Sequence, residues 1–435
     1  MQKFIAFMEK YIVPVAGKMG SQRHLAAIRD GFIAVMPLIL VSSLASLING
    51  FPSETFQNFM NNTFGEVWKE VGGGMWTGSF AILAIIIAFT TSYNLAKSYG
   101  IDALSAGIIS ISSLIILTPT VEKGAGLDFG WTGPKGLFVA IILSLLVTEA
   151  FRFFVKREIT FKMPDGVPPA VVRSFAALVP AFIILTVIAG IKLAVKLAGT
   201  SVHEFIFNTL QLPLQGLAGT LPSAIVVVLF VHILWFFGLH GPNIVGGIIE
   251  PLYLPALEKN IKMFQDGMSS FDVPNIITKP FFDTFVYLGG SGATLAFLVV
   301  VLIVAKSAQL RGVSRLSIGP GAFNINEPVI FGTPIILNPI LFVPFIVTPI
   351  VLVITSYTAI SLGWVPKTVA MIPWATPPII SGYLVTGGHL SGAILQLFNF
   401  VIAMVIYYPF VVLCDRSIIK TEKTTAQGKD QSVPM

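Results

Sequence analysis

Long apolar segments dominate this chain and restrict its possible folds more than any other feature. The clear runs are residues 26–48, 76–96, 103–118, 137–155, 171–195, 217–237, 284–305, 337–362 and 391–413. Most of them approach or exceed the roughly 20 residues that a helix needs to cross a bilayer. Only 11% of the residues are charged, against about 25% in soluble domains. Because a chain in lipid must satisfy its own backbone hydrogen bonds, the sequence predicts an all-α polytopic membrane protein.

The basic residues predict which loops face the cytoplasm. Clusters of Lys and Arg lie at the N-terminus, after the fourth run, after the seventh run and in the tail. By the positive-inside rule all four clusters are cytoplasmic. Parity then requires one more crossing between His240 and Asp283, and one segment after Arg315 that fails to cross fully. The result is about ten transmembrane helices with both termini inside, and two weak, interrupted segments at 244–264 and 368–385.

The two halves of the chain differ in character. Residues 1–200 consist mostly of uninterrupted apolar runs, whereas Gly, Pro and polar residues accumulate in residues 201–415. Interrupted apolar segments often carry a transport site, so we predict a scaffold or oligomerisation half followed by a substrate half. The polar tail 416–435 is predicted to be disordered and cytoplasmic. The amphipathic segment Met1–Lys18 lacks the apolar core of a secretory signal and is typical of a helix on the membrane surface.

The composition excludes several function classes. The single cysteine, Cys414, allows no intramolecular disulfide, and its position at the end of the last run indicates a passive small residue. No Cys/His metal spacing, Walker loop or nucleophile elbow occurs in the sequence. The chain therefore predicts no metal, no cofactor and no ATPase activity of its own. The net charge of +6 fits cytoplasmic loops rather than nucleic-acid binding.

One acidic residue stands out in the second half. Glu327 lies in the run Asn324-Ile325-Asn326-Glu327-Pro328, among Gly, Pro and aliphatic residues. A carboxylate at membrane depth is costly and is by default a functional-site candidate. Asn324 and Asn326 could orient the hydroxyl groups of a polyol while Glu327 accepts a hydroxyl proton or a hydrogen bond. In the alternative, Glu327 accepts backbone N–H groups exposed by a broken helix.

Two histidines flank the end of the sixth apolar run. His240 precedes Gly241-Pro242, which stops a helix. It is either an imidazole at the mouth of a buried site or a cap on the C-terminus of the preceding helix. His232 lies two turns earlier on a plain apolar stretch, and we predict a structural role for it.

Two tryptophans are candidates for contact with a ligand. Trp235 precedes His240, and Trp374 lies between prolines. An indole face can cover the apolar C–H face of a sugar while its N–H bonds a hydroxyl. The alternative is the interfacial Trp belt of membrane proteins.

Other charged residues in the apolar runs favour structural roles. Asp283 opens the seventh run and is predicted to cap a helix N-terminus. Glu149 and Arg152 are spaced to pair on one helix face.

Three segments together resemble a known family. They are Gly238-Leu239-His240-Gly241-Pro242-Asn243, the stretch from Pro280-Phe281-Phe282-Asp283 to Gly292-Ala293-Thr294, and Phe323-Asn324-Ile325-Asn326-Glu327-Pro328. This combination resembles enzyme IIC, the membrane component of the bacterial sugar phosphotransferase system, in its lactose, cellobiose and diacetylchitobiose branch. The resemblance extends over almost the whole chain, to about Arg416.

The resemblance implies a homodimer of ten-span protomers in the bacterial cytoplasmic membrane. The N-terminal half would form the dimer contact, and re-entrant hairpins in the second half would build the sugar site. A β-linked disaccharide, such as cellobiose or N,N'-diacetylchitobiose, would bind from outside, move inward and be phosphorylated on its 6-hydroxyl. The phosphoryl donor would be a phosphocysteine on a separate enzyme IIB, charged in turn by IIA. This chain would then be the transporter component of a phosphotransferase, without complete catalytic machinery.

The resemblance also implies roles for individual residues. Glu327 would hold the accepting hydroxyl and take its proton, and His240 would contact the same sugar or stabilise the incoming phosphate. The candidate substrate-binding residues are Asn326, Asn243, Trp235 and Trp374, of which the tryptophans would pack on the sugar rings. The basic loops 156–162 and 306–315 are candidate docking surfaces for the partner, with ordinary positive-inside charge as the alternative.

Two other function classes compete with a sugar permease. The first is an ion-coupled secondary transporter in which Glu327 and His240 relay protons. The second is a membrane scaffold or channel. A single acid beside tandem Asn residues suits a neutral polyol better than a proton pathway of several acids.

Overall fold

The chain folds into helices joined by loops. The computed structural model describes residues 21–51, 53–121, 126–161, 163–164, 166–168, 175–333, 335–336 and 338–430. Within these ranges the only β-structure is an isolated bridge between Thr120 and Leu127, which confirms the predicted all-α class. The surface helix predicted at Met1–Lys18 lies outside the described residues.

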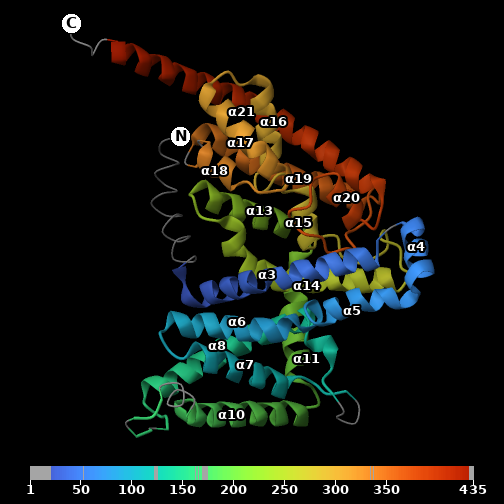
Figure 1. Cartoon of the computed structure of the whole chain (residues 1–435), viewed down its shortest axis with the longest axis vertical. Coiled ribbons are helices and arrows are strands. Elements are labelled where there is room, and N and C mark those ends of the chain that lie inside the picture. The colour runs from blue at the N-terminus through green and yellow to red at the C-terminus, as the bar shows by residue number, and fades with distance from the viewer. Residues whose placement is uncertain are drawn as a thin grey trace.

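The α-helices fall into an N-terminal and a C-terminal group. The first comprises α3 (Arg23–Asn49), α4 (Glu54–Phe64), α5 (Lys69–Thr77), α6 (Leu83–Ser98), α7 (Ala103–Leu117), α8 (Leu137–Lys156) and α10 (Leu178–Leu197). The second comprises α11 (Val202–Ile206), α12 (Leu212–Ala218), α13 (Leu221–Phe236), α14 (Gly241–Gln265), α15 (Lys279–Phe285), α16 (Thr294–Val304), α17 (Ala308–Ala322), α18 (Glu327–Gly332), α19 (Pro339–Ser361), α20 (Ile380–Val385) and α21 (Leu390–Asp430). In Figure 1 the long helices α3, α6, α8, α7 and α10 lie one beneath another, α14 lies beside α3, and α13 and α16 to α21 lie above them.

Fewer helices than expected are long and apolar enough to cross a membrane by themselves. The described residues contain six such helices, or up to seven if the bent pair Val202–Ala218 and Leu221–Phe236 forms one span. The expected ten crossings are not reached by this criterion. The apolar helices Ala103–Leu117 and Thr294–Val304 are shorter, and α14 contains two prolines beyond its first turn and several charged residues. The chain is nonetheless a multi-pass membrane protein.

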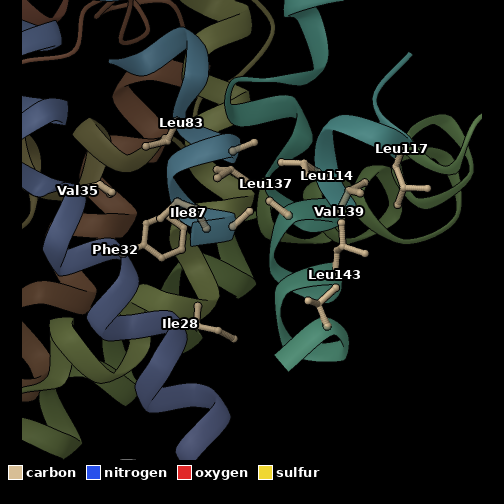
Figure 2. Close-up of a cluster of buried hydrophobic side chains, with 14 of the residues drawn as sticks. Ile28, Phe32, Val35, Leu83, Ile87, Leu114, Leu117, Leu137, Val139 and Leu143 are labelled. Atoms are coloured by element: carbon tan, nitrogen blue, oxygen red, sulfur yellow. The ribbon is translucent and has the colours of Figure 1, made fainter. Parts of the chain in front are cut away.

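The N-terminal group of helices packs around a continuous apolar core. Figure 2 shows side chains of this core from α3, α6, α7 and α8, including Phe32, Ile87 and Leu143. Leu254 and Leu257 of α14 belong to the same cluster. Because α14 also packs against α13, this helix joins the N-terminal core to the C-terminal group.

Breaks in the C-terminal helices place loop backbone inside the molecule. The apolar run predicted at 284–305 is split: α15 ends at Phe285, and α16 begins only at Thr294. Between them the backbone turns through Gly289, Gly290 and Gly292, with φ of 83°, 95° and 85°. These conformations suit glycine because other residues rarely adopt them. We call residues 289–293 the glycine turn.

The C-terminal helix extends into the segment for which a disordered tail is predicted. Helix α21 continues through residues 416–430 to Asp430, because its Lys, Glu, Ala and Gln residues favour continued helix. Asp415, on the same helix, accepts hydrogen bonds from the backbone N–H groups of Lys306 at 2.9 Å and Ser307 at 2.8 Å. This carboxylate ties α21 to the start of α17.

The ion pair expected in the N-terminal half is confirmed. Arg152 Nη1 donates to Glu149 Oε2 at 3.0 Å. The same carboxylate also contacts His24 Nε2 at 3.0 Å and accepts from the Tyr99 hydroxyl. The pair therefore links α8 to α3 and to the end of α6.

Candidate functional site

The predicted site residues line one cavity. Its volume is about 310 Å³, at the lower end of the range of about 300–1,000 Å³ for small-molecule sites. The lining includes all six candidates, which are Trp235, His240, Asn243, Asn326, Glu327 and Trp374. They come from α13, the turn after it, α14, the loop before α18, the start of α18, and the loop before α20. These segments are separated by up to 140 residues in sequence, so the tertiary fold alone brings them together.

The turn between α13 and α14 is tight enough to require glycine. Gly238 has a φ of 74°. At Gly241 a Cβ atom would lie 2.0 Å from the carbonyl oxygen of Val231, which no side chain could tolerate. This close approach directs the start of α14 back against α13 and places His240 at the cavity.

His240 and Glu327 face each other across the cavity. His240 Nδ1 accepts a hydrogen bond from the backbone N–H of Asn243 at 3.2 Å, so His240 caps the N-terminus of α14. The predicted alternative had placed this cap on the C-terminus of the preceding helix. With Nδ1 acting as the acceptor, the proton of a neutral imidazole is on Nε2. Nε2 lies 3.6 Å from Glu327 Oε1.

The Glu327 side chain is exposed enough to contact a ligand. It is the first residue of α18, and its side chain is 47% exposed. Among the described residues no backbone N–H donates to its carboxylate, which disfavours the alternative of a backbone acceptor. The separation from His240 exceeds a direct hydrogen bond and lets a hydroxyl group contact both side chains.

The two asparagines hold the loops that surround the cavity. Asn324 Oδ1 accepts from the Gly289 N–H at 2.8 Å, and its Nδ2 donates to the carbonyl oxygens of Trp374 at 2.6 Å and Thr376 at 3.2 Å. Asn326 Nδ2 donates to Ser291 O at 2.9 Å. The amide of Asn324 is thus committed to the backbone and does not orient a polyol as predicted. Asn326 still lines the cavity.

The two tryptophans differ in what they can offer a ligand. Trp235 is 1% exposed and packs on the His240 ring, with 4.4 Å between ring centroids. Trp374 is 39% exposed. Only Trp374 therefore has a broad open face for a sugar ring, whereas Trp235 fixes the orientation of His240.

His232 is a buried support of the glycine turn. It is 0% exposed, and its Nδ1 donates to Val228 O at 2.6 Å. Its Nε2 accepts from the Gly292 N–H at 2.7 Å, while the Tyr407 hydroxyl donates to Gly292 O at 2.7 Å. This agrees with the structural role predicted for His232. The turn that it holds contributes Gly290 and Ser291 to the cavity wall.

The cavity also contains a group of charged residues that the sequence interpretation missed. Glu250, Lys279 and Asp283 all line it. Asp283 does not cap a helix as predicted, because it lies inside α15 and accepts from Lys279 Nζ at 2.6 and 2.7 Å. The cavity lining therefore contains Glu250 and Asp283 besides Glu327, so the preference for a neutral polyol over a proton pathway cannot rest on a single acid. Charged residues inside weak apolar segments were the signal that could have revealed this group.

Comparison with known proteins shows the family to which this chain belongs. The family model described as "Phosphotransferase system, EIIC" matches residues 29–349. The chain belongs to this family of membrane permease components, which confirms the resemblance seen in the sequence.

Individual relatives match over nearly their full length. A cellobiose-specific EIIC component of Geobacillus stearothermophilus is 44% identical over 430 residues, which are 96% of this chain and 95% of the relative. The lichenan permease IIC component of Bacillus subtilis is 42% identical, with 97% and 96% covered. The crystal structure of the transporter ChbC, the IIC component of an N,N'-diacetylchitobiose-specific phosphotransferase system, matches with a TM-score of 0.91 and 44% identity. That match covers 96% of this chain and 99% of ChbC.

Proposed function

We propose that this chain binds a β-linked disaccharide, such as cellobiose or N,N'-diacetylchitobiose, translocates it and presents its 6-hydroxyl for phosphorylation. The phosphoryl donor would be a phosphocysteine on a separate enzyme IIB, supplied by IIA. The observation that carries the proposal is the pairing of His240 and Glu327 in the cavity, 3.6 Å apart. The names of the relatives support the class of sugar.

The two residues divide the chemistry between them. Glu327 accepts the hydrogen bond of the 6-hydroxyl and takes its proton as the oxygen attacks phosphorus. The S–P bond of the phosphocysteine breaks, an O–P bond to the sugar forms, and the thiolate remains on IIB. The Nε2–H of His240 donates to the same hydroxyl or to a phosphate oxygen. Phosphoryl transfer depends mainly on positioning and charge. The imidazole of His240, which caps α14, and the hydrogen-bonded loops around the cavity supply both.

The Glu327→Gln variant tests this assignment. Purified protein in vesicles is given labelled cellobiose and phosphorylated IIB, and sugar phosphate is measured. We expect Gln, which cannot accept the proton, to abolish phosphorylation while disaccharide binding persists. Normal phosphorylation in this variant would eliminate the general-base role.

The same vesicles distinguish the permease from an ion-coupled transporter. The permease should accumulate phosphorylated sugar only with phosphorylated IIB and should ignore a proton ionophore. Uptake of unmodified sugar that the ionophore stops would establish the competing class. Protein that binds neither cellobiose nor diacetylchitobiose saturably would favour a scaffold.

The proposal extends to the assembly and its orientation. The protein would lie in the bacterial cytoplasmic membrane with both termini inside, as a homodimer joined through residues 1–200. Phe182 and Leu197 of α10 are 72% and 81% exposed, as a lipid or partner contact requires. The basic loops 156–162 and 306–315 are the proposed docking surfaces for IIB. Cross-linking of single cysteines on α10, in membranes, tests the dimer contact.

A further inference from the structure

The cavity has a second polar region on α14, away from His240. Its lining residues on this helix are Pro242, Asn243, Gly246, Ile249 and Glu250. These positions recur at the spacing of one helix face, so a single stripe of α14 follows the cavity. Glu250 is nine residues beyond the start of the helix, a rise of about 14 Å. The stripe therefore extends well past the His240–Glu327 pair.

The Glu250 carboxylate lies close to Gly246 on the same helix. A Cβ atom at Gly246, one turn before Glu250, would lie 3.5 Å from Glu250 Oε1. The side chain thus leans along the helix toward its N-terminus, as helical side chains do. This direction points the carboxylate back over the stripe that borders the cavity.

Glu250 makes no hydrogen bond or ion pair with any of the described residues. Its neighbours in the lining, Lys279 and Asp283, are instead paired with each other. A carboxylate without a hydrogen-bond partner inside a membrane protein is costly. Its retention at a cavity wall is explained when a ligand supplies the missing donors.

The paired residues add a donor to this acceptor. A lysine ammonium has three N–H groups, and Lys279 directs Nζ at both oxygens of Asp283. One N–H group is left for a ligand, and the pair itself is neutral overall. Glu250 and Lys279 together offer an acceptor and a donor, which is what a sugar hydroxyl needs because it both donates and accepts.

We propose that Glu250, with the Lys279–Asp283 pair beside it, binds hydroxyl groups of the sugar ring that is not phosphorylated. The inference rests on the proposed function, since it assigns the second ring of the same disaccharide. His240 and Glu327 hold the ring that accepts phosphate. The Glu250 group then determines how tightly a disaccharide binds, without taking part in the transfer.

Binding and kinetics of Glu250→Ala and Glu250→Gln test this division. Equilibrium binding of labelled cellobiose to the purified full-length protein should weaken about 10- to 100-fold in the Ala variant, as for a lost hydrogen bond to a charged group. With phosphorylated IIB, KM should rise by the same factor while kcat at saturating sugar stays within about twofold. Glu250→Gln, which keeps one acceptor oxygen, should fall between wild type and Ala.

A monosaccharide and a control variant separate a binding role from a structural one. Phosphorylation of β-methyl glucoside, which lacks the second sugar ring, should be unchanged in Glu250→Ala. Glu258→Gln is the matched control, because Glu258 lies on the same helix, pairs with Lys262 at 2.8 Å and is outside the cavity lining. It should leave every parameter at the wild-type value.

Three results would overturn the inference. One is unchanged cellobiose affinity in Glu250→Ala. Another is an equal loss for β-methyl glucoside and cellobiose, which would make Glu250 a structural residue. The third is a fall in kcat with unchanged KM, which would place Glu250 in the transfer step. If the wild-type protein binds no disaccharide at all, the proposed function fails first, and that outcome is distinct from the other three.

Discussion

Replacement of His232 is the sharpest test of how the buried polar residues shape the cavity. In wild type the Gly292 N–H donates to His232 Nε2 at 2.7 Å, and His232 is 0% exposed. In His232→Leu this buried N–H loses its acceptor. An unsatisfied buried donor costs about 1–3 kcal/mol. The contact to Val228 O contributes less, because that carbonyl keeps its helical bond within α13. We therefore expect about 2 kcal/mol of destabilisation.

Two further variants identify which nitrogen of His232 matters. Gln places its amide oxygen near the position of Nε2 and can still accept from Gly292. Asn reaches only the position of Nδ1 and can still donate to Val228 O. We expect His232→Gln to retain most of the stability and His232→Asn to lose as much as Leu.

The assay is thermal unfolding of the full-length protein with and without cellobiose. Loosening the glycine turn should lower Tm by a few degrees, following the scale of about 2–4 °C per kcal/mol for domains of 150–250 residues. It should also shrink the sugar-induced rise in Tm, because that rise depends on affinity and the turn carries Gly290 and Ser291 to the cavity. Equal Tm values for the Gln and Asn variants, or a wild-type Tm for the Leu variant, would contradict the role of His232 Nε2 in holding the glycine turn.

Three other predictions follow from single contacts. His240→Ala should weaken sugar binding or transfer about 10- to 100-fold; unchanged affinity and rate would leave His240 only its capping role. Gly290→Ala should destabilise by more than about 1 kcal/mol, since φ is 95° and a Cβ would lie 2.6 Å from Asn326 Cγ. Gly312→Ala, with open space around it, is the control, and a normal Tm for Gly290→Ala would contradict the packing. Asp415→Asn should lower the stability to thermal unfolding by about 1–2 kcal/mol, because one of the two side-chain oxygens that accept backbone N–H groups is lost. The control Arg416→Gln, at an exposed position, should change stability little. Equal Tm values for the two variants would contradict the link between α21 and α17.

Local interpretation of the sequence failed where backbone geometry mattered. The run 284–305 has the composition of a span, yet the glycine turn divides it, because positive φ values are available at its glycines. The same break brings Gly289 to Asn324 and Ser291 to Asn326, so both asparagines hold loops, and only the amide of Asn324 is fully committed to them. The paired Lys279 and Asp283 were missed for a related reason. Asp283 was assigned to a helix N-terminus, whereas it lies one turn after Lys279 inside the short helix α15, where residues four apart can pair.

The class of the protein follows from its amino-acid sequence. Its apolar runs require a helical membrane fold, because lipid offers the backbone no hydrogen-bond partners. Its costly residues, His240 and Glu327, marked the candidate site, because a polar group among apolar residues needs a reason to be kept. The folded arrangement was needed to show that these two face each other, that Trp235 is buried while Trp374 is open, and that Glu250 shares their cavity. Such facts depend on contacts between segments up to 140 residues apart, and no local pattern encodes them.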